Sequence, residues 1–175
     1  MKVLVLNGSP RKNGNVAKTL KRETEKFQQK HDDCEIIWKD VCDLNFGFCK
    51  GCMACRSSGK CVMPEDDTHI IAEELSGCSM IFVGTPVYWA NMNGKLKALF
   101  DRLVATFMAE STHGIPKPLH KGKKAVIVTS CTTPFPFNYL CGQTSGAVRA
   151  VKEVLKTAGF KIIKKINLSN TKKSR

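Results

Sequence analysis

The sequence predicts an α/β fold: a doubly wound, five-stranded parallel sheet with helices on both of its faces. Short, continuous apolar runs such as residues 3–6 and 80–83 are typical of strands that are covered on both faces. Segments with apolar residues at helical spacing separate these runs, and strands that alternate with helices form parallel sheets. Right-handed crossovers and a single switch point favour the strand order 2-1-3-4-5.

In the first half of the chain, turn-forming residues separate the predicted elements. These elements are a strand at residues 3–6, a helix at 15–30, a strand at 34–38, a short helix at 66–75 and a strand at 80–83. Between them, residues 41–64 are too long for a routine connection. A loop of this length in a compact domain is usually functional.

The second half repeats the alternation of helix and strand. A helix begins at Gly94, a strand follows at residues 125–128, a last helix ends at Gly159, and a fifth strand covers 160–168. Residues 111–123 and 129–142 read as irregular connections. The polar tail after residue 168 is expected to fray.

Length and composition predict a single domain, residues 1–175, with a cysteine-rich loop at 46–64. No apolar run approaches the ~20 residues of a membrane span. The four apolar residues before Asn7 are too few for a signal peptide, so we expect a cytoplasmic protein. Nine cysteines in a reducing compartment argue against a disulfide framework and favour metal, iron–sulfur or redox roles where they cluster.

The net charge of +13 favours anionic partners, such as phosphorylated cofactors, NADPH, acidic redox proteins or nucleic acid. The basic residues are spread along the chain, however, and aromatic residues make up only 7%. Spread charge is more typical of a solvated surface than of a nucleic-acid footprint.

The loop after the first strand has the features of a phosphate site. It is rich in Gly, Ser and Asn and leads into a helix N-terminus, where free N–H groups and the helix dipole favour an anion. Ser9, Asn13 and Asn15 can add side-chain donors, and Arg11 and Lys12 add charge. Neither G-x-G-x-x-G nor G-x-x-x-x-G-K-[ST] is present, so a monophosphate such as that of FMN suits the loop better than a pyrophosphate. The alternative is an ordinary strand-to-helix turn.

The loops after the third and fourth strands should lie beside this one, because the carboxyl ends of parallel strands meet at one edge of the sheet. In residues 85–91, Pro86 fixes the turn, the next N–H groups can face the polar edge of a planar ligand, and Tyr88 and Trp89 can wall a ring. Alternatively, these aromatic residues cap the core or an interface.

Three segments, GSPRKNGN, TPVYW and NGKLKALFDRL, resemble the NADPH-dependent FMN reductase branch of the flavodoxin-like superfamily. The resemblance covers roughly residues 1–168 and implies a flavodoxin-like fold, and dimers or tetramers with the flavin near a subunit interface. It implies a flavin phosphate held by Ser9, Arg11, Asn13, Asn15 and Val16, a ring against Pro86, Val87, Tyr88 and Trp89, and Ser130, Cys131, Thr132 and Thr133 beneath the ring.

Two positions depart from the pattern of that family. Val16 stands where a hydroxyl residue is common, so one phosphate ligand is missing. The third loop reads Cys131-Thr132-Thr133-Pro134 where glycines are usual, which would reshape the pocket.

Four cysteines, Cys49, Cys52, Cys55 and Cys61, form the pattern C-x2-C-x2-C-x5-C. Soft thiolates this close together suit iron or zinc, and the spacing is nearer the compact ferredoxin run than paired zinc knuckles. The pattern also resembles the motif of iron–sulfur flavoproteins, which pair FMN with a [4Fe–4S] cluster. Zinc and a metal-free loop that borders the flavin stay open.

The remaining cysteines and the histidines point to no further site. Cys34, Cys42 and Cys78 lie next to apolar strands and are expected in the core, whereas Cys131 lies in the third loop and Cys141 is ambiguous. The histidines form no ligand-spaced set, and no nucleophilic triad can be argued.

These observations together predict an FMN-dependent oxidoreductase. Hydride would pass from NAD(P)H to the flavin and on to a quinone, a free flavin or another acceptor, small molecule or protein, with no catalytic side chain required. One alternative is an electron-transfer protein that relays electrons between FMN, a [4Fe–4S] cluster and a ferredoxin. Another is a non-catalytic basic binding module.

Overall fold

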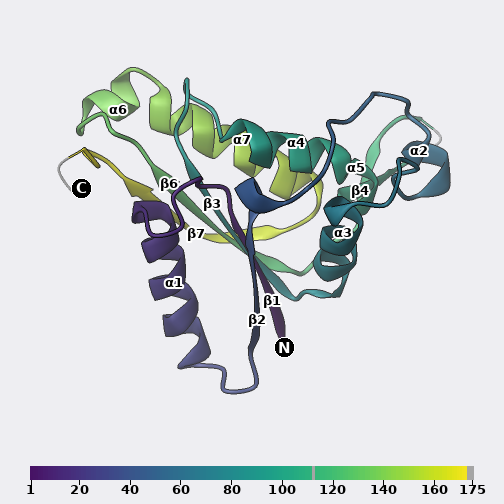
Figure 1. The fold of residues 1–175 in the computed structure, drawn as a ribbon, viewed down its shortest axis with the longest axis horizontal. Helices are drawn as coiled ribbons and strands as arrows, with labels where there is room; N and C mark the ends of the chain where they lie inside the picture. Colours follow the sequence, from purple (N-terminus) through teal and green to yellow (C-terminus); the bar gives the residue numbers. More distant parts are fainter. Residues whose placement is uncertain (112, 173–175) are drawn as a thin grey trace.

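The computed structural model describes residues 1–111 and 113–172, and Figure 1 shows their arrangement around a central parallel sheet. The sheet has five strands in the order β2-β1-β3-β6-β7, and each neighbouring pair is parallel. The strands are β1 (Lys2–Asn7), β2 (Glu35–Asp40), β3 (Met80–Pro86), β6 (Lys124–Ser130) and β7 (Lys161–Leu168). The predicted five-stranded parallel sheet is therefore confirmed.

Two short strands that the sequence did not predict change the strand numbering. β4 (Met108–Glu110) and β5 (Pro116–Pro118) lie along the chain between β3 and β6 and pair antiparallel as a separate ribbon. In chain numbering the sheet order is therefore 2-1-3-6-7 rather than 2-1-3-4-5. Each strand is three residues long and β5 begins and ends with proline. Strands this short carry no alternating pattern that a sequence analysis could detect.

Helices cover both faces of the sheet. α1 (Asn15–Gln28) packs on one face, and α3 (Asp67–Gly77), α4 (Gly94–Arg102) and α7 (Gln143–Thr157) pack on the other (Figure 1). The shorter helices are η1 (Val41–Asp43), α2 (Cys55–Ser58), α5 (Val104–Phe107) and α6 (Phe137–Leu140). Among the residues that the structure describes, no helix has the length and hydropathy needed to cross a bilayer.

The first strand explains the two-sided core. Its residues alternate between the faces of the sheet, because successive side chains of a strand point in opposite directions. Val3 and Val5 join the cluster beneath α1, whereas Leu4 and Leu6 join the cluster beneath α3, α4 and α7. All four side chains are fully buried, as the continuous apolar run predicts.

Gly84 on β3 sets how closely α1 approaches the sheet. A Cβ atom at Gly84 would lie 2.6 Å from both Leu20 Cδ1 and Val16 Cγ1 on α1. The carbonyl of Gly84 also accepts a hydrogen bond of 2.7 Å from the N–H of Gly8. The start of α1 and the loop before it are therefore fixed against the end of β3.

The two long loops contain short helices. α2 lies within the cysteine-rich segment, and α6 lies within the segment 129–142 that was expected to be irregular. Of the cysteines expected in the core, Cys78 is buried, but Cys34 and Cys42 are only half-buried, because each lies just outside the apolar run of its strand. Residues 173–175 of the tail, which the sequence predicts to fray, lie outside the described residues.

Candidate functional site

A cavity of about 460 Å³ opens at the carboxyl ends of β1, β3 and β6, where the three predicted loops meet. Its walls combine the loop before α1, the first two turns of that helix, the loops after β3 and β6, and the end of the described chain. The lining residues are Ser9, Pro10, Arg11, Asn13, Gly14, Asn15, Val16, Lys18, Pro86, Val87, Tyr88, Ser130, Thr132, Thr171 and Lys172. Ten of the thirteen residues expected to bind FMN therefore line a single cavity.

Hydrogen bonds within the loop before α1 fix its conformation. The N–H of Ser9 donates to Asn7 Oδ1 at 3.2 Å, and the N–H of Arg11 donates to Ser9 Oγ at 3.2 Å. Gly14 is the N-cap of the helix, and within the described residues no side chain caps this turn. The helix terminus thus presents backbone donors and its positive dipole end to the cavity, which is the arrangement that binds phosphate.

The basic residues at the cavity are not all those that the sequence suggested. Lys12 forms an ion pair with Asp43 at 2.5 Å, and that hydrogen bond raises the pKa of this exposed ammonium. Lys12 does not line the cavity, whereas Lys18 and Lys172 do. Lys18 lies on the first turns of α1, one helical turn beyond the N-cap, so its position follows from the helix spacing.

The loop after β3 corrects two expectations. The N–H of Val87 donates to the carbonyl of Ser130 at 2.8 Å, and Tyr88 exchanges backbone hydrogen bonds with Asn91. These N–H groups are therefore engaged within the protein and do not face a ligand. The Val87 bond joins the second loop to the third, and the bonds between Tyr88 and Asn91 close a turn within the second loop.

Trp89 does not line the cavity, although Tyr88 does. Trp89 and Ala90 have left-handed backbone conformations, with φ of 51° and 58°, at the tip of the tight turn that Tyr88 and Asn91 close. The turn directs the Trp89 side chain into solvent, where it is fully exposed. Sequence position next to Tyr88 could not reveal this, because adjacent residues of a turn point in different directions.

In the third loop, Ser130 and Thr132 line the cavity, but Cys131 and Thr133 do not. The thiol of Cys131 is buried and donates to Gln143 Oε1 at 3.2 Å, and the hydroxyl of Thr133 donates to the same oxygen at 2.6 Å. Both side chains are thus turned toward the start of α7.

The end of the described chain was not predicted to reach the site. The hydroxyl of Thr171 donates to the carbonyl of Cys131 at 3.0 Å, so the segment after β7 folds back along the third loop and brings Thr171 and Lys172 to the cavity. The tail is polar and has no periodicity, so the sequence offered no signal for this contact. Pro10 and Gly14 were also missed, although both lie inside the predicted phosphate loop.

The cysteine-rich loop lies away from the cavity. None of the residues 46–64 lines it, and in Figure 1 α2 lies beside α3, α5 and β4, far from α6 and the end of the chain. The alternative in which this loop borders the flavin of its own chain is therefore not supported. Cys49 and Cys52 are exposed, and Cys55 and Cys61 are half-buried.

The four cysteines of this loop share one neighbourhood. Burial raises the pKa of the Cys55 thiol, and Cys61, Cys49 and Cys52 raise it further as neighbouring negative groups. Within residues 1–111 and 113–172, however, no three or more His, Cys, Asp or Glu side chains converge as a set of metal ligands.

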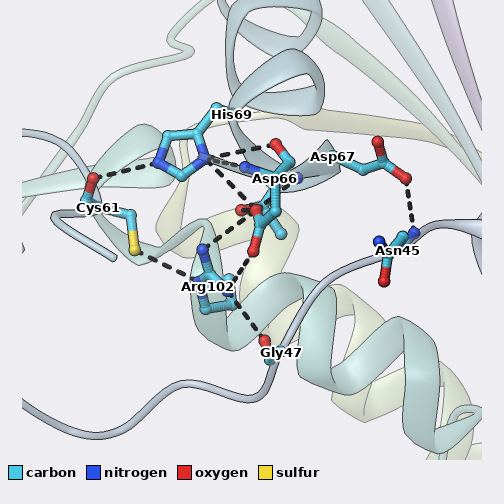
Figure 2. Close-up of polar contacts among 8 residues, drawn as sticks. Asn45, Gly47, Cys61, Asp66, Asp67, His69 and Arg102 are labelled. Carbon is cyan, nitrogen blue, oxygen red and sulfur yellow. Dashed lines mark hydrogen bonds and ion pairs between the residues drawn. The ribbon is translucent and has the colours of Figure 1, made fainter. Parts of the chain in front are cut away.

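A buried ion pair anchors the end of the cysteine-rich loop (Figure 2). Arg102, at the end of α4, has a side chain with no exposed surface, and its Nη1 and Nη2 donate to the carboxylate of Asp66 at 2.8 and 3.2 Å. Its Nη1 also donates to the carbonyl of Gly47 at 2.9 Å, and its Nε donates to the Sγ of Cys61 at 3.3 Å. Sequence analysis missed this network, because no spacing rule relates these residues.

The ring of His69 contacts the backbone carbonyl of Cys61. The N–H of Asp66 donates to His69 Nδ1 at 3.1 Å, which favours the tautomer that carries its proton on Nε2. That nitrogen lies 3.3 Å from the carbonyl oxygen of Cys61 and can donate to it (Figure 2). Asp66 in turn accepts the N–H of Thr68, which completes a capping box at the start of α3.

The residues present fit a flavin mononucleotide, whereas the thiols of the cysteine-rich loop do not converge into a set of cluster ligands within the described residues. The cavity has the volume of a typical cofactor site, apolar walls from Pro86 and Val87, and an anion-binding helix terminus beside Arg11. The loop offers four thiols, and two of them already accept N–H donors: Cys49 from Gly51 at 3.4 Å and Cys61 from Arg102. Such N–H···S contacts are typical around cluster ligands.

Comparison with curated proteins finds iron–sulfur flavoproteins. One from Methanosarcina thermophila is 35% identical over 104 residues, which are 59% of this chain and 53% of that protein. Another, from Clostridioides difficile, is 31% identical over 102 residues, 58% of this chain and 45% of the relative. The chain therefore spans about half the length of these relatives.

Solved structures show the same fold at low sequence identity. An azoreductase from Bacillus anthracis has a TM-score of 0.78 at 13% identity, with 97% of this chain and 87% of that chain covered. An NAD(P)H:quinone oxidoreductase from Methanothermobacter marburgensis has a TM-score of 0.74 at 17% identity, with 97% and 85% covered. These similarities establish a fold shared with such enzymes.

The family model of the NADPH-dependent FMN reductases matches residues 1–135, which include β1, α1, β3 and the loops that follow them. The match thus covers most of the residues that line the cavity. The chain belongs to the NADPH-dependent FMN reductase family.

Proposed function

We propose that the protein is an FMN-dependent oxidoreductase that takes its electrons from NAD(P)H. The observation that carries the proposal is the single cavity in which the start of α1 meets the loops after β3 and β6. Family membership and the quinone-reductase and azoreductase neighbours agree with this assignment.

In this proposal the chain supplies binding and position. The N-terminal amides of α1, with Ser9, Arg11 and Asn13, hold the phosphate. Pro86 and Val87 provide an apolar wall that keeps water from the ring, and Ser130 and Thr132 face it from the third loop. FMN itself, when bound, supplies the hydride chemistry, so no side chain is required as a general acid.

The charge of the chain bears on the choice of electron donor. The net charge of +13 favours encounter with an anionic dinucleotide. We propose a quinone, a flavin or a redox protein as acceptor, a homodimer or homotetramer as the assembly, and the cytoplasm as the location. Trp89 in the loop after β3, and Phe135 and Leu140 in the segment after β6, are exposed apolar side chains, which is consistent with an interface.

A spectrum and a turnover assay test this function. Protein purified without oxygen should show flavin absorption bands, and NADPH or NADH should bleach those bands under anaerobic conditions. A colourless protein that takes up no added FMN would contradict the proposal. Bound flavin that neither nucleotide reduces would leave FMN binding in place and contradict the NAD(P)H-dependent activity.

A second candidate function is that of an iron–sulfur flavoprotein, in which Cys49, Cys52, Cys55 and Cys61 bind a [4Fe–4S] cluster. Two observations favour it. The other three cysteines are near enough to Cys55 to raise the pKa of its thiol, and the chain is similar to iron–sulfur flavoproteins. The cluster would supply one-electron transfer to or from an acceptor such as a ferredoxin.

Iron analysis distinguishes the two candidates. Anaerobic protein should contain about four irons per chain if one [4Fe–4S] cluster is bound. Changing Cys55 to Ala should then remove the iron and leave the flavin bands intact. If neither the native protein nor protein reconstituted with iron contains iron, the cluster is refuted and the reductase function remains.

A further inference from the structure

A groove of about 570 Å³ adjoins the cavity along α1. It is lined by α1, by the end of β7 and by the segment that follows β7, and Figure 1 shows the end of the chain beside the start of α1. The groove and the cavity share Asn15, Lys18 and Thr171 as lining residues. The two hollows therefore meet at the helix terminus where the phosphate of FMN is proposed to bind.

We propose that this groove, the α1 groove, is a second anion subsite, in which Arg22 and Lys18 bind the 2′-phosphate of NADPH. Arg22 lines the groove but not the cavity, whereas Lys18 lines both. The inference rests on the proposed oxidoreductase function and deepens it, because it names NADPH rather than NADH as the preferred electron donor. It also assigns that preference to particular side chains.

The two cations of the groove have few partners within the protein. Lys18 and Arg22 are one helical turn apart, so their side chains lie on the same face of α1. Across the part of the chain that the structure describes, the ammonium of Lys18 has no ion pair or hydrogen bond. Arg22 has only an ion pair with Glu23, whose 3.6 Å distance is longer than a hydrogen bond.

The groove has no carboxylate among its described lining residues, so nothing there offsets the two positive charges. Glu23 lies beside Arg22 in the sequence, but its side chain is buried and also pairs with Lys164 and Lys26. The opposite wall is polar. The side chains of Ser169 and Asn170 make no hydrogen bond within the described residues, so they are available to the hydroxyl groups of a ribose.

The charge of the groove matches a phosphate monoester. Such a group carries about −1.5 to −2 charges at pH 7 and three acceptor oxygens, which two neighbouring cations can share. The guanidinium of Arg22 can donate two parallel hydrogen bonds to it, and the ammonium of Lys18 adds a point charge. NADPH has a phosphate monoester on its adenosine ribose and NADH does not. The groove should therefore distinguish the two donors.

Calorimetric titration of the FMN-loaded protein with 2′,5′-ADP tests the subsite directly. Arg22→Ala should weaken the binding of 2′,5′-ADP about tenfold, the value of a hydrogen bond to a charged group, and should raise the KM for NADPH by a similar factor. The affinity for FMN and the KM for NADH should not change. Arg22→Lys keeps the charge but loses the paired donors, so it should retain part of the affinity.

Lys26→Ala is the matched control. Lys26 lies one turn beyond Arg22 on α1 and also pairs with Glu23, at 3.7 Å, but it lines neither the groove nor the cavity. This variant removes one positive charge and one ion pair of Glu23, as Arg22→Ala does. It should bind 2′,5′-ADP with the wild-type affinity.

The outcomes separate this inference from the function on which it rests. Equal affinities of wild type and Arg22→Ala for 2′,5′-ADP would overturn the subsite, and so would equal losses for NADPH and NADH. Weaker binding of FAD in Arg22→Ala, with NADPH unaffected, would overturn the assignment to NADPH. Wild type that binds no FMN would contradict the oxidoreductase function, whereas binding of 2′,5′-ADP to flavin-free protein that depends on Arg22 would still support the subsite.

Discussion

At the scale of single residues, Asp66 connects three parts of the molecule. It caps α3 through Thr68, pairs with Arg102 at the end of α4, and through that residue fixes Cys61. Burial alone raises the pKa of Asp66, but the hydrogen bonds from Thr68 and Arg102 outweigh burial, and the pKa lies below its ordinary value. The ionised carboxylate is therefore the form that stabilises the fold.

The lowered pKa of Asp66 predicts a pH-dependent stability. The stabilisation is fully present above the unfolded pKa of about 4 and is lost as pH falls through the lower folded value. Urea unfolding between pH 7 and pH 3 should show wild type losing more stability than Asp66→Asn over the acid end of the range. If the free energy of unfolding falls equally with pH in wild type and Asp66→Asn, the stabilising role of the ionised Asp66 is contradicted.

Arg11 offers a residue-scale test of the phosphate site. It lines the cavity beside the N-terminus of α1, so Arg11→Ala should weaken FMN binding by about 10- to 100-fold, the value of one hydrogen bond to a charged group. Fluorescence titration with FMN measures the effect. Arg149→Ala, which removes an exposed charge from α7, should leave the affinity unchanged. Equal affinities for wild type and Arg11→Ala would mean that the phosphate lies elsewhere.

At the scale of elements, the contact of α1 with β3 decides whether the helix terminus reaches the cavity. Gly84 allows the close approach, and Gly8 and Gly84 share a backbone hydrogen bond of 2.7 Å. The cavity is thus a product of helix packing as much as of loop sequence. A side chain at Gly84 would push α1 outward and move its N-terminal amides.

Gly84→Ala should therefore lower the free energy of unfolding by about 1–3 kcal/mol through overpacking and should also weaken FMN binding. Gly77→Ala in α3 is the matched control, because a Cβ there would meet nothing within 4 Å and alanine favours a helix. Chemical denaturation and FMN titration measure both effects. A Gly84→Ala protein as stable as the control would show that α1 can shift without cost.

At the scale of the whole molecule, the parallel sheet gathers distant segments at one edge. The cavity unites residues near positions 10, 87, 131 and 171, which only the strand order β1-β3-β6 brings together. A ligand that bridges these loops should stabilise the fold as a unit, because it binds the native state and not the unfolded chain.

FMN at 100 times its Kd should raise the free energy of unfolding by about 2.7 kcal/mol, which is about 5–10 °C in Tm for a chain of this size. Differential scanning calorimetry measures the shift, and Arg11→Ala at the same FMN concentration should show a smaller one. Riboflavin, which lacks the phosphate, is the matched ligand. A shift as large with riboflavin would argue against the helix-terminus site.

The sequence by itself determined the sheet, the place of the Gly- and Asn-rich loop before α1 and the family, because these depend on local patterns. The apolar run at residues 3–6 requires burial on both faces, and a Gly- and Asn-rich turn before a helix exposes backbone donors wherever it lies. The soft-metal loop indicated by the cysteine spacing stays a prediction, because within the described residues these thiols do not converge as a set of metal ligands. Loop segments were less well predicted, since the ribbon β4–β5 and α6 are too short to carry a period.

Only the tertiary structure decided which side chains face the cavity and what holds the cysteine-rich loop. Trp89 points away because a left-handed turn reverses its direction, and Cys131 is turned toward Gln143. Thr171 reaches the cavity, and Arg102 reaches Cys61 across forty-one positions of sequence, by long-range contacts that no local pattern encodes. Such contacts are fixed by the packing of whole elements, and packing depends on all residues at once.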